Sequence, residues 1–294
     1  MDRTASGLKS SKSWLVNSRT RRKGKTPKGD LVLRSLSLFY IGLLVILPIV
    51  AITSEAFKGS LADLWKNIAA PQALYSLKLT FLMALIMVII NVIAGTATAW
   101  VLVRYKFPLK NLMNALIDLP FAIPTVVTGI MLVALYGPNS FLGVFLAKHG
   151  IEIIFAKPGI VLALLFVSYP FVVRSVQPVL HEMDKDMEEA AKTLGAKPFT
   201  IFRRIALPTL WPAILTGAAL SFSRAIGEFG SIAIASGNIP FKTQVSSVYI
   251  YGELESYNKQ GALGVSVVLL FCSLLILILL NRVQVWSRKN ESAG

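Results

Sequence analysis

Long uncharged, mostly apolar runs alternate with short polar segments along this chain. Six runs stand out: Ser35–Ser54, Leu79–Val103, Leu119–Ala147, Pro158–Val173, Ile205–Ser223 and Gln260–Asn281. A helix needs about 20 predominantly apolar residues to cross a lipid bilayer. The pattern therefore predicts an all-α integral membrane bundle of six transmembrane helices over residues 35–282. By length alone, five or seven spans remain alternatives.

Two of the runs depart from the length of a single span. The run from residue 158 is short, and we expect Arg174 to end that span by extending its charged group to the membrane interface. The run from residue 119 is too long for one span. Gly137-Pro138-Asn139 lies within it and is a turn signature that should break it.

Prolines inside the predicted spans should distort them. Pro120 and Pro124 lie in the third span, and Pro170 lies in the fourth. A proline inside a helix removes a backbone hydrogen bond and kinks the helix. We therefore expect bends there, which would either open a cavity or form a gate. Asp118 is interpreted as an interfacial or capping acid.

Composition supports a membrane protein that has neither a catalytic site nor a metal site. Of 294 residues, 54% are hydrophobic and 15% are charged, whereas soluble domains carry roughly 25% charged residues. Cys272 is the only cysteine, and the two histidines fall in opposite predicted loops, so neither a disulfide within the chain nor a metal cluster is expected. The sequence predicts no catalytic residues and no bound metal.

The distribution of basic residues predicts the orientation in the membrane. If six spans place both ends on one side, that side carries 21 Lys and Arg residues and the other side carries seven. Cytoplasmic loops carry the excess of positive charge. The arm 1–34, the tail 283–294 and the loop 178–208 are therefore all predicted to be cytoplasmic, in a plasma (inner) membrane.

The net charge of +15 arises largely in the amino-terminal arm, which has ten basic residues and two acidic ones. Anionic lipid surfaces attract such segments. We expect a disordered arm lying along membrane lipid and no nucleic-acid partner. An organellar targeting role for the arm is the alternative, because it is rich in Ser and Arg and poor in acids.

The loop 178–208 is the longest polar interruption between spans. Met183, Met187, Ala190, Ala191 and Leu194 fall at helical spacing and predict an amphipathic helix over residues 182–194. A glycine follows at position 195, where helices commonly end in a left-handed cap, and a second short helix should begin at position 198. The apolar stripe could dock onto a partner or lie on the protein's own bundle, and periodicity alone leaves both possibilities open.

The same loop carries the motif Glu189-Ala190-Ala191, Gly195, Ile205, Leu207-Pro208. Its spacing resembles the signature loop of bacterial ABC-importer permease subunits. In that family the loop forms a coupling helix that sits in a groove of the ATP-binding subunit. The resemblance implies a type I ABC importer permease fold, with Glu189, Ala190, Ala191, Gly195, Leu207 and Pro208 coupling this chain to that subunit.

Further segments resemble the oxyanion branch of the family, and the T-type (CysT) sulfate/thiosulfate permeases in particular. They are Leu119–Pro124, Leu135–Asn139, Phe171–Pro178, Arg224–Gly230 and Gly237–Thr243. The resemblance covers residues 35 to 285. It implies a second, related permease as heterodimer partner, two ATP-binding subunits and an extracytoplasmic sulfate/thiosulfate-binding protein.

The chain lacks the Gly-x-x-x-x-Gly-Lys-Ser/Thr loop that cradles phosphates in such ATPases. The chain is therefore not expected to be an enzyme, and ATP with its magnesium should bind the partner subunit. We expect alternating access, in which the partner supplies differential binding free energy to two states of the bundle.

Arg224 and Glu228 are charged residues in or beside the fifth span, four positions apart on what should be one helix face. Charged groups inside a membrane usually face the bundle interior or a water-filled path. With Ser221 and Ser223, they are predicted to line or gate the path of an anion, because the planar guanidinium donates parallel hydrogen bonds to oxyanions. A purely structural ion pair is the alternative.

Three other functions compete with sulfate/thiosulfate import. Molybdate or tungstate could be the cargo of the same kind of permease. A secondary anion transporter acting without ATP is a different class, but neither proton-relay carboxylates nor inverted repeats are apparent in the sequence. An assembly subunit with no conduit is the third, and the intramembrane charges weigh against it.

Overall fold

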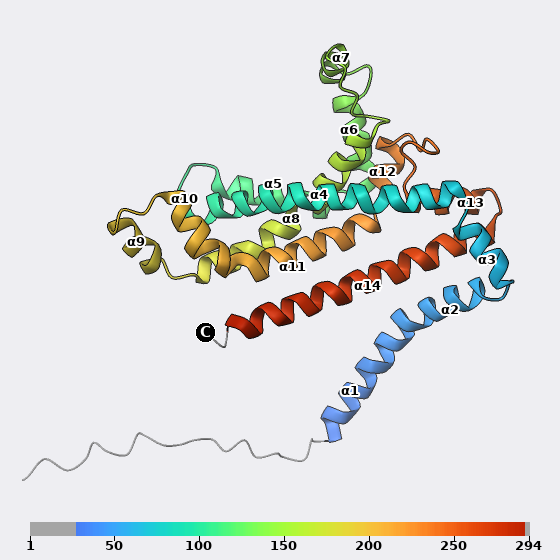
Figure 1. The fold of residues 1–294 in the computed structure, drawn as a ribbon, viewed down its shortest axis with the longest axis horizontal. Helices are drawn as coiled ribbons and strands as arrows, with labels where there is room; N and C mark the ends of the chain where they lie inside the picture. The colour runs from blue at the N-terminus through green and yellow to red at the C-terminus, as the bar shows by residue number, and fades with distance from the viewer. Residues whose placement is uncertain (1–27, 292–294) are drawn as a thin grey trace, which may run out of the picture. The chain divides into compact units, whose positions relative to one another are not determined.

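The computed structural model describes residues 28–291, and every regular element in that range is helical. The elements are α1 Lys28–Ile41, η1 Gly42–Ile46, α2 Leu47–Ala56, α3 Leu61–Ile68, α4 Pro71–Arg104, α5 Lys110–Ala122, α6 Thr125–Tyr136, α7 Phe141–Lys148, α8 Lys157–Glu182, α9 Asp186–Thr193, α10 Pro198–Ile201, η2 Phe202–Ala206, α11 Leu207–Ile226, α12 Gly230–Ala235, α13 Ser246–Glu255 and α14 Lys259–Glu291 (Figure 1). The chain divides into two compact units, Met1–Ala51 and Ile52–Gly294.

The first unit contains α1, the π-helical turn η1 and the start of α2. α1 begins at Lys28, so residues 28–34 of the predicted disordered arm are helical, and the rest of the arm lies outside the described residues. Val32–Ala56 is apolar and long enough to span a membrane, in agreement with the first predicted span. Its side chains up to Ala51 are almost all exposed, as expected of a helix that faces lipid.

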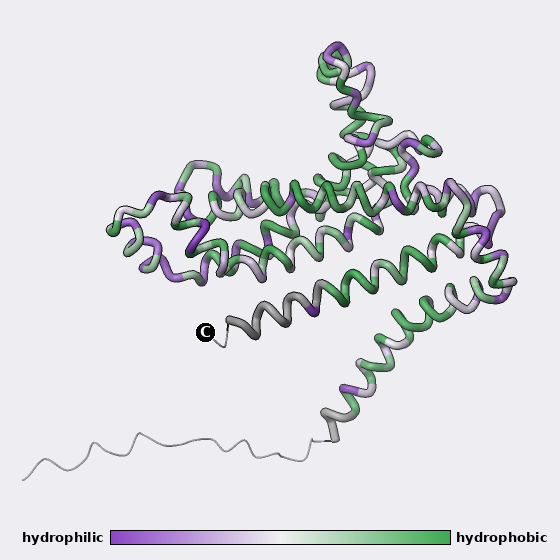
Figure 2. Tube along the Cα trace, viewed as in Figure 1, coloured by the Kyte–Doolittle hydropathy of each residue, from purple (hydrophilic) through white to green (hydrophobic). Residues whose placement is uncertain are grey.

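The second unit holds the other candidate spans. Four helical stretches pass the length and hydropathy requirements by themselves: Pro71–Arg104, Lys157–Glu182, Pro198–Ile226 and Lys259–Leu279. The pair α5 and α6 passes only when the two helices are taken together. The described residues thus contain five spans, or six if the pair counts as one, which agrees with the prediction. Figure 2 shows apolar residues along the helices and polar residues at the connections.

The third predicted span is broken at Ile123-Pro124, where α5 and α6 meet at an angle of 114°. Ile123 is extended (φ −90°, ψ 128°), the conformation that a following proline favours. Pro124 is the N-cap of α6 and Pro120 lies inside α5. The turn predicted at residues 137–139 is confirmed, since α6 ends at Tyr136 and α7 begins at Phe141.

The predicted end of the fourth span is not an end of the helix. α8 continues through Pro170 and Arg174 as one helix of 26 residues and ends at Glu182. Arginine favours a helix interior, and the Arg174 side chain, 35% exposed, is paired with a carboxylate. It binds both carboxylate oxygens of Asp118 on α5, at 2.7 and 2.5 Å. Asp118 is therefore the counterion of Arg174 and not only an interfacial acid.

The centre of the second unit is the packing of α4, α8 and α11. Val172 of α8 lies between Gly95 of α4 and Gly217 of α11, where a methyl group added to each glycine would lie 2.9 and 2.7 Å from it. Such close approach of helix backbones is typical of membrane bundles. This packing fixes α8, which leads into the predicted coupling segment, against α11, which carries Arg224 near its end.

Candidate coupling segment and translocation path

The segment that carries the predicted coupling motif forms a separate short helix. The predicted helix over residues 182–194 is interrupted: α8 ends at Glu182, Met183 is extended, and α9 begins at Asp186. Asp184 explains the interruption, because its Oδ1 accepts a hydrogen bond at 3.0 Å from the backbone N–H of Asp186. A short acidic side chain that bonds to the backbone nearby favours a helix start over a helix interior.

The predicted apolar stripe is divided. Met183 precedes α9 and is buried at 8%, whereas Met187 is 55% exposed and Leu194 is 88% exposed, with Ala190 exposed and Ala191 half-buried between them. The buried residue is Glu188, at 5%. Of the two interpretations left open by periodicity, this arrangement favours a docking surface, because apolar side chains that rested on the protein's own bundle would be buried. Glu189 is exposed beside the stripe.

Gly195 ends α9 in the left-handed conformation, with φ +80°, which confirms the predicted cap. Its N–H donates to the carbonyl of Lys192 at 2.9 Å, and the N–H of Ala196 donates to the carbonyl of Ala191 at 3.0 Å. These two bonds make a Schellman motif. The glycine thus fixes the direction in which the chain leaves α9.

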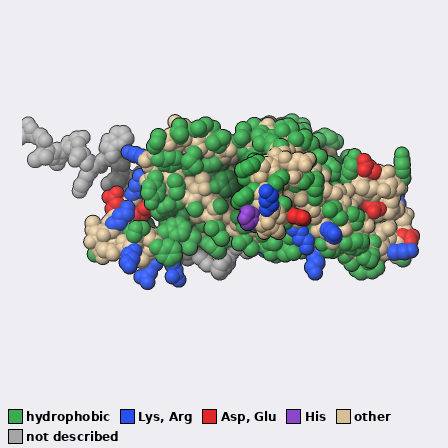
Figure 3. Space-filling model, turned by 90° about the horizontal axis from the view of Figure 1, so that it is seen from above, with side chains coloured by type: hydrophobic (Ala, Val, Ile, Leu, Met, Phe, Trp, Pro, Cys, Tyr) green, Lys and Arg blue, Asp and Glu red, His purple; other side chains and the backbone are tan. Residues whose placement is uncertain are grey.

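The return segment runs from α10 through η2 into α11. Pro198 begins α10, as predicted, and Phe199 is 72% exposed. η2 is one π-helical turn, a feature that often marks functional positions. Leu207 and Pro208 then open α11. Lys and Arg side chains gather at this end of the unit, where α9 and α10 lie (Figure 3).

One interaction of this segment was not anticipated from the sequence. Arg104, the last residue of α4, donates from Nη2 to Oε1 of Glu188 at 2.6 Å. Both side chains are more than nine-tenths buried. The two residues are 84 positions apart, and the sequence carries no signal that pairs them. The sequence placed Glu188 only on the expected polar face of the helix, which does not indicate a buried partner.

The predicted path residues Arg224 and Glu228 do pair, with Nη1 and Oε2 2.7 Å apart. They do not share a helix face, because α11 ends at Ile226 and Glu228 lies in the link before α12. Glu228 is almost fully buried, and its Oε1 also accepts from the N–H and Oγ of Ser231, at 2.9 and 2.8 Å. The carboxylate is therefore held in place by two hydrogen bonds and one ion pair.

Arg224 remains partly open. Its side chain is 32% exposed, and no described residue accepts a hydrogen bond from its Nε or Nη2. Ser223 is half-buried beside it. Ser221 is fully buried, where its Oγ accepts from Nδ2 of Asn91 at 3.0 Å and donates to the carbonyl of Ser168 at 3.3 Å. Of the predicted set, Arg224 and Ser223 are partly accessible, whereas Ser221 belongs to the helix packing.

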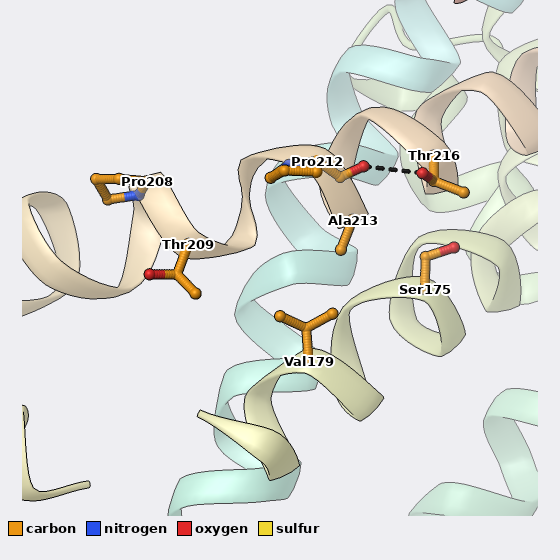
Figure 4. Close-up of a pocket in the computed structure, with 7 residues that line it drawn as sticks. All are labelled: Ser175, Val179, Pro208, Thr209, Pro212, Ala213 and Thr216. Atoms are coloured by element: carbon orange, nitrogen blue, oxygen red, sulfur yellow. Dashed lines mark hydrogen bonds between the residues drawn. The ribbon is translucent and has the colours of Figure 1, made fainter. Parts of the chain in front are cut away.

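A cleft of about 630 Å³ lies at the other end of α11. Ser175 and Val179 of α8 form one wall, and α11 forms the other (Figure 4). The residues of the second wall are Pro208, Thr209, Pro212, Ala213 and Thr216. The wall residues include three hydroxyl groups and no acidic side chain, so the cleft would not repel an anion.

Comparisons with known proteins agree with this geometry. The family model described as "Binding-protein-dependent transport system inner membrane component" matches residues 91–290. The chain belongs to this family. As a permease of this kind it is a multi-pass membrane subunit of a transport system, as the apolar helices also indicate.

Two curated relatives cover nearly the whole permease. The probable sulfate transport system permease protein cysT of Nephroselmis olivacea is 44% identical over 255 residues, which is 87% of this chain and 90% of the relative. The sulfate transport system permease protein CysT of Salmonella typhimurium is 42% identical over 248 residues, or 84% of this chain and 90% of the relative.

Solved structures show the same fold at low sequence identity. A chain of a bacterial alginate ABC transporter, solved with a periplasmic protein bound to an alginate pentasaccharide, matches with a TM-score of 0.70 and 16% identity over 87% of this chain and 94% of that one. A chain of the MetNI methionine ABC transporter matches with a TM-score of 0.55 and 17% identity over 72% and 94%. The permease thus has the helical architecture of ABC transporter subunits.

Proposed function

We propose that this permease imports sulfate or thiosulfate and forms half of the translocation path of an ATP-driven importer. The observation that carries the proposal is the 42–45% identity, over about 85% of the chain, to permeases named for sulfate transport. An alignment of 248 or more of the 294 residues must include the coupling segment and the Arg224 region. Molybdate and tungstate are the other oxyanions that the same path would have to reject or accept.

The energy for transport comes from a separate ATP-binding subunit. α9 supports this proposal, because its apolar residues Met187 and Ala190 are exposed beside Glu189 and are not used in the hydrophobic core of its own unit. ATP and magnesium bind that partner. When two such subunits close on ATP, they move α9 and the bundle with it. The ATP-bound subunits must therefore bind one of the two states of the bundle more tightly than the other.

The complete importer contains two permeases, two ATP-binding subunits and an extracytoplasmic binding protein. A related second permease, as a heterodimer partner, completes the path. The alginate and methionine transporters that share this fold are ABC complexes, and the former was solved with its periplasmic protein. Substrate selection then rests largely on the binding protein.

The anion passes along α11, between Arg224 and the cleft formed with α8. Arg224 offers guanidinium donors near one end. The cleft near the other end has no acidic side chain, and its Thr209 and Thr216 hydroxyls already donate to backbone carbonyls. Glu228 lowers the attraction of Arg224 for an anion. A conduit needs such weak sites, because a tight one would not release its cargo.

Both termini and α9 lie on the cytoplasmic side in this proposal, as the excess of basic residues predicts. A reporter enzyme that is active only in the cytoplasm should be active when fused after Gly294 and inactive when fused after Gly237. A periplasmic reporter at the same two positions should give the opposite pattern. Cytoplasmic activity at position 237 would contradict the topology.

Uptake of labelled sulfate into proteoliposomes tests the proposed function. The complete complex should take up sulfate only with ATP and loaded binding protein, and Arg224→Lys should slow uptake about tenfold although it keeps the ion pair with Glu228. Full activity of Arg224→Lys would show that the anion does not need the guanidinium, and it would favour a structural role for the ion pair. Uptake of molybdate but not sulfate would reassign the cargo, and uptake without the ATP-binding subunits would indicate a secondary transporter.

A further inference from the structure

Three helix ends meet at Arg104. It is the last residue of α4, and Glu188 lies in the first turn of α9. Nη1 of Arg104 donates to the carbonyl of Leu180 at 2.9 Å. Leu180 lies in the last turn of α8, where helix carbonyls lack intrahelical partners. A cation is favourable at the carboxyl end of a helix and an anion at the amino end. The dipoles of all three helices thus favour this ion pair.

The guanidinium also lies over the ring of Trp100, 5.5 Å from its centroid. Trp100 in turn contacts the edge of Phe202 in η2, with ring centroids 5.3 Å apart. Arg104 therefore connects α9 to α4 and α8 directly, and to η2 through Trp100. Its Nε is buried without a hydrogen-bond partner among the described residues.

α9 has few other attachments to its unit. Among the described elements it packs substantially only against α10, which continues through η2 into α11. The amino end of α9 follows α8 after the short link 183–185, in which Met183 is buried. The buried ion pair adds a side-chain attachment to α4, which packs along both α8 and α11. A displacement of α9 must therefore also displace or break this pair.

We infer that the ion pair between Arg104 and Glu188 transmits the movement of α9 to the membrane helices, and that both are positioning residues for transport. The inference rests on the proposed function, in that a separate ATP-binding subunit moves α9. Glu188 is buried in the ion pair, whereas Met187 and Leu194 of the stripe are exposed, so the pair occupies a different face of α9. Docking and transmission are therefore carried by different residues and can be separated experimentally.

The double variant Arg104→Met/Glu188→Gln tests the inference in the complete complex in proteoliposomes. Removing both charges leaves no unpaired buried ion, and such replacements are often neutral or stabilising for the fold. If the pair only stabilised the protein, this variant would transport normally. We expect it to bind the ATP-binding subunits and hydrolyse ATP while the sulfate imported per ATP falls about tenfold.

Lys106→Met and Glu182→Gln are the matched controls, because each removes an exposed charge next to the same helix ends. Both should keep the ratio of sulfate to ATP of the unmodified complex. Normal transport by the double variant would overturn the inference, and so would loss of the ATP-binding subunits on purification, which would make the pair a docking element. If instead the unmodified complex fails to import sulfate, the proposed function fails, while ATP hydrolysis stimulated by the binding protein still reports on the coupling.

Discussion

Gly217→Ala is expected to destabilise the permease by about 1–3 kcal/mol, the typical cost of adding atoms to a packed core. The added methyl group would lie 2.7 Å from Cα of Val172 and 3.2 Å from the carbonyl oxygen of Phe171. These are backbone atoms of α8, so relief requires α8 and α11 to separate. The thermal unfolding midpoint in mild detergent should fall, and Gly217→Leu should yield no folded protein.

Gly252→Ala is the matched control for this substitution. Gly252 lies inside α13, and no atom lies within 4 Å of the place a methyl group would take. Alanine favours a helix over glycine by about 1 kcal/mol, so this variant should unfold at the same temperature or slightly higher. Equal midpoints for the two alanine variants would show that α8 and α11 are not packed as closely as described.

The spans were predictable from the sequence because their signal is one of composition. Five of the six predicted runs lie within continuous helical stretches, at Val32–Ala56, Pro71–Arg104, Lys157–Glu182, Pro198–Ile226 and Lys259–Glu291. Their ends were less predictable. α8 extends past Arg174, which pairs with Asp118 on α5, and local sequence does not indicate a partner 56 positions away.

The break in the third span was only partly predictable. Pro124 indicated a bend, but nothing in the local pattern indicated 114° between α5 and α6. The angle depends on tertiary packing, because α6 is held against α12, where Gly129 approaches the backbone of Ser231. Contacts between distant segments set such an angle, whereas proline sets only its position.

In the candidate sites too, local features were predictable from the sequence, whereas contacts between distant residues were not. The cap of α9 followed from one glycine, and the apolar spacing from Met187 to Leu194 followed from periodicity. Periodicity did not decide whether that stripe is exposed, and the structure buries Met183 but exposes Leu194. The burial of Glu188 did not follow, because helical periodicity assigns a charged residue to the solvent face unless its partner is known. The position of Glu228 beyond the end of α11 was also missed, since Gly227 signals a helix end only weakly within an apolar run.

Gly195→Pro is expected to abolish sulfate uptake and the binding of the ATP-binding subunit. Proline fixes φ near −65° and has no N–H, whereas position 195 needs φ +80° and donates to the carbonyl of Lys192. The last turn of α9 would unwind and turn Leu194 away from the docking surface. Gly195→Ala should retain binding, because nothing lies within 4 Å of the added methyl group and the left-handed conformation costs about 1–2 kcal/mol.

Gly150 offers a matched control for the proline substitution. It follows α7 with φ +74°, has the same open surroundings, and makes the same pair of helix-ending bonds through its own N–H and that of Ile151. Gly150→Pro therefore imposes the same backbone damage at a different helix end. It should leave the ATP-binding subunit attached on copurification, whereas Gly195→Pro should lose it. If both variants retained the subunit equally, the end of α9 would have no part in docking, and the exposed stripe would need another explanation.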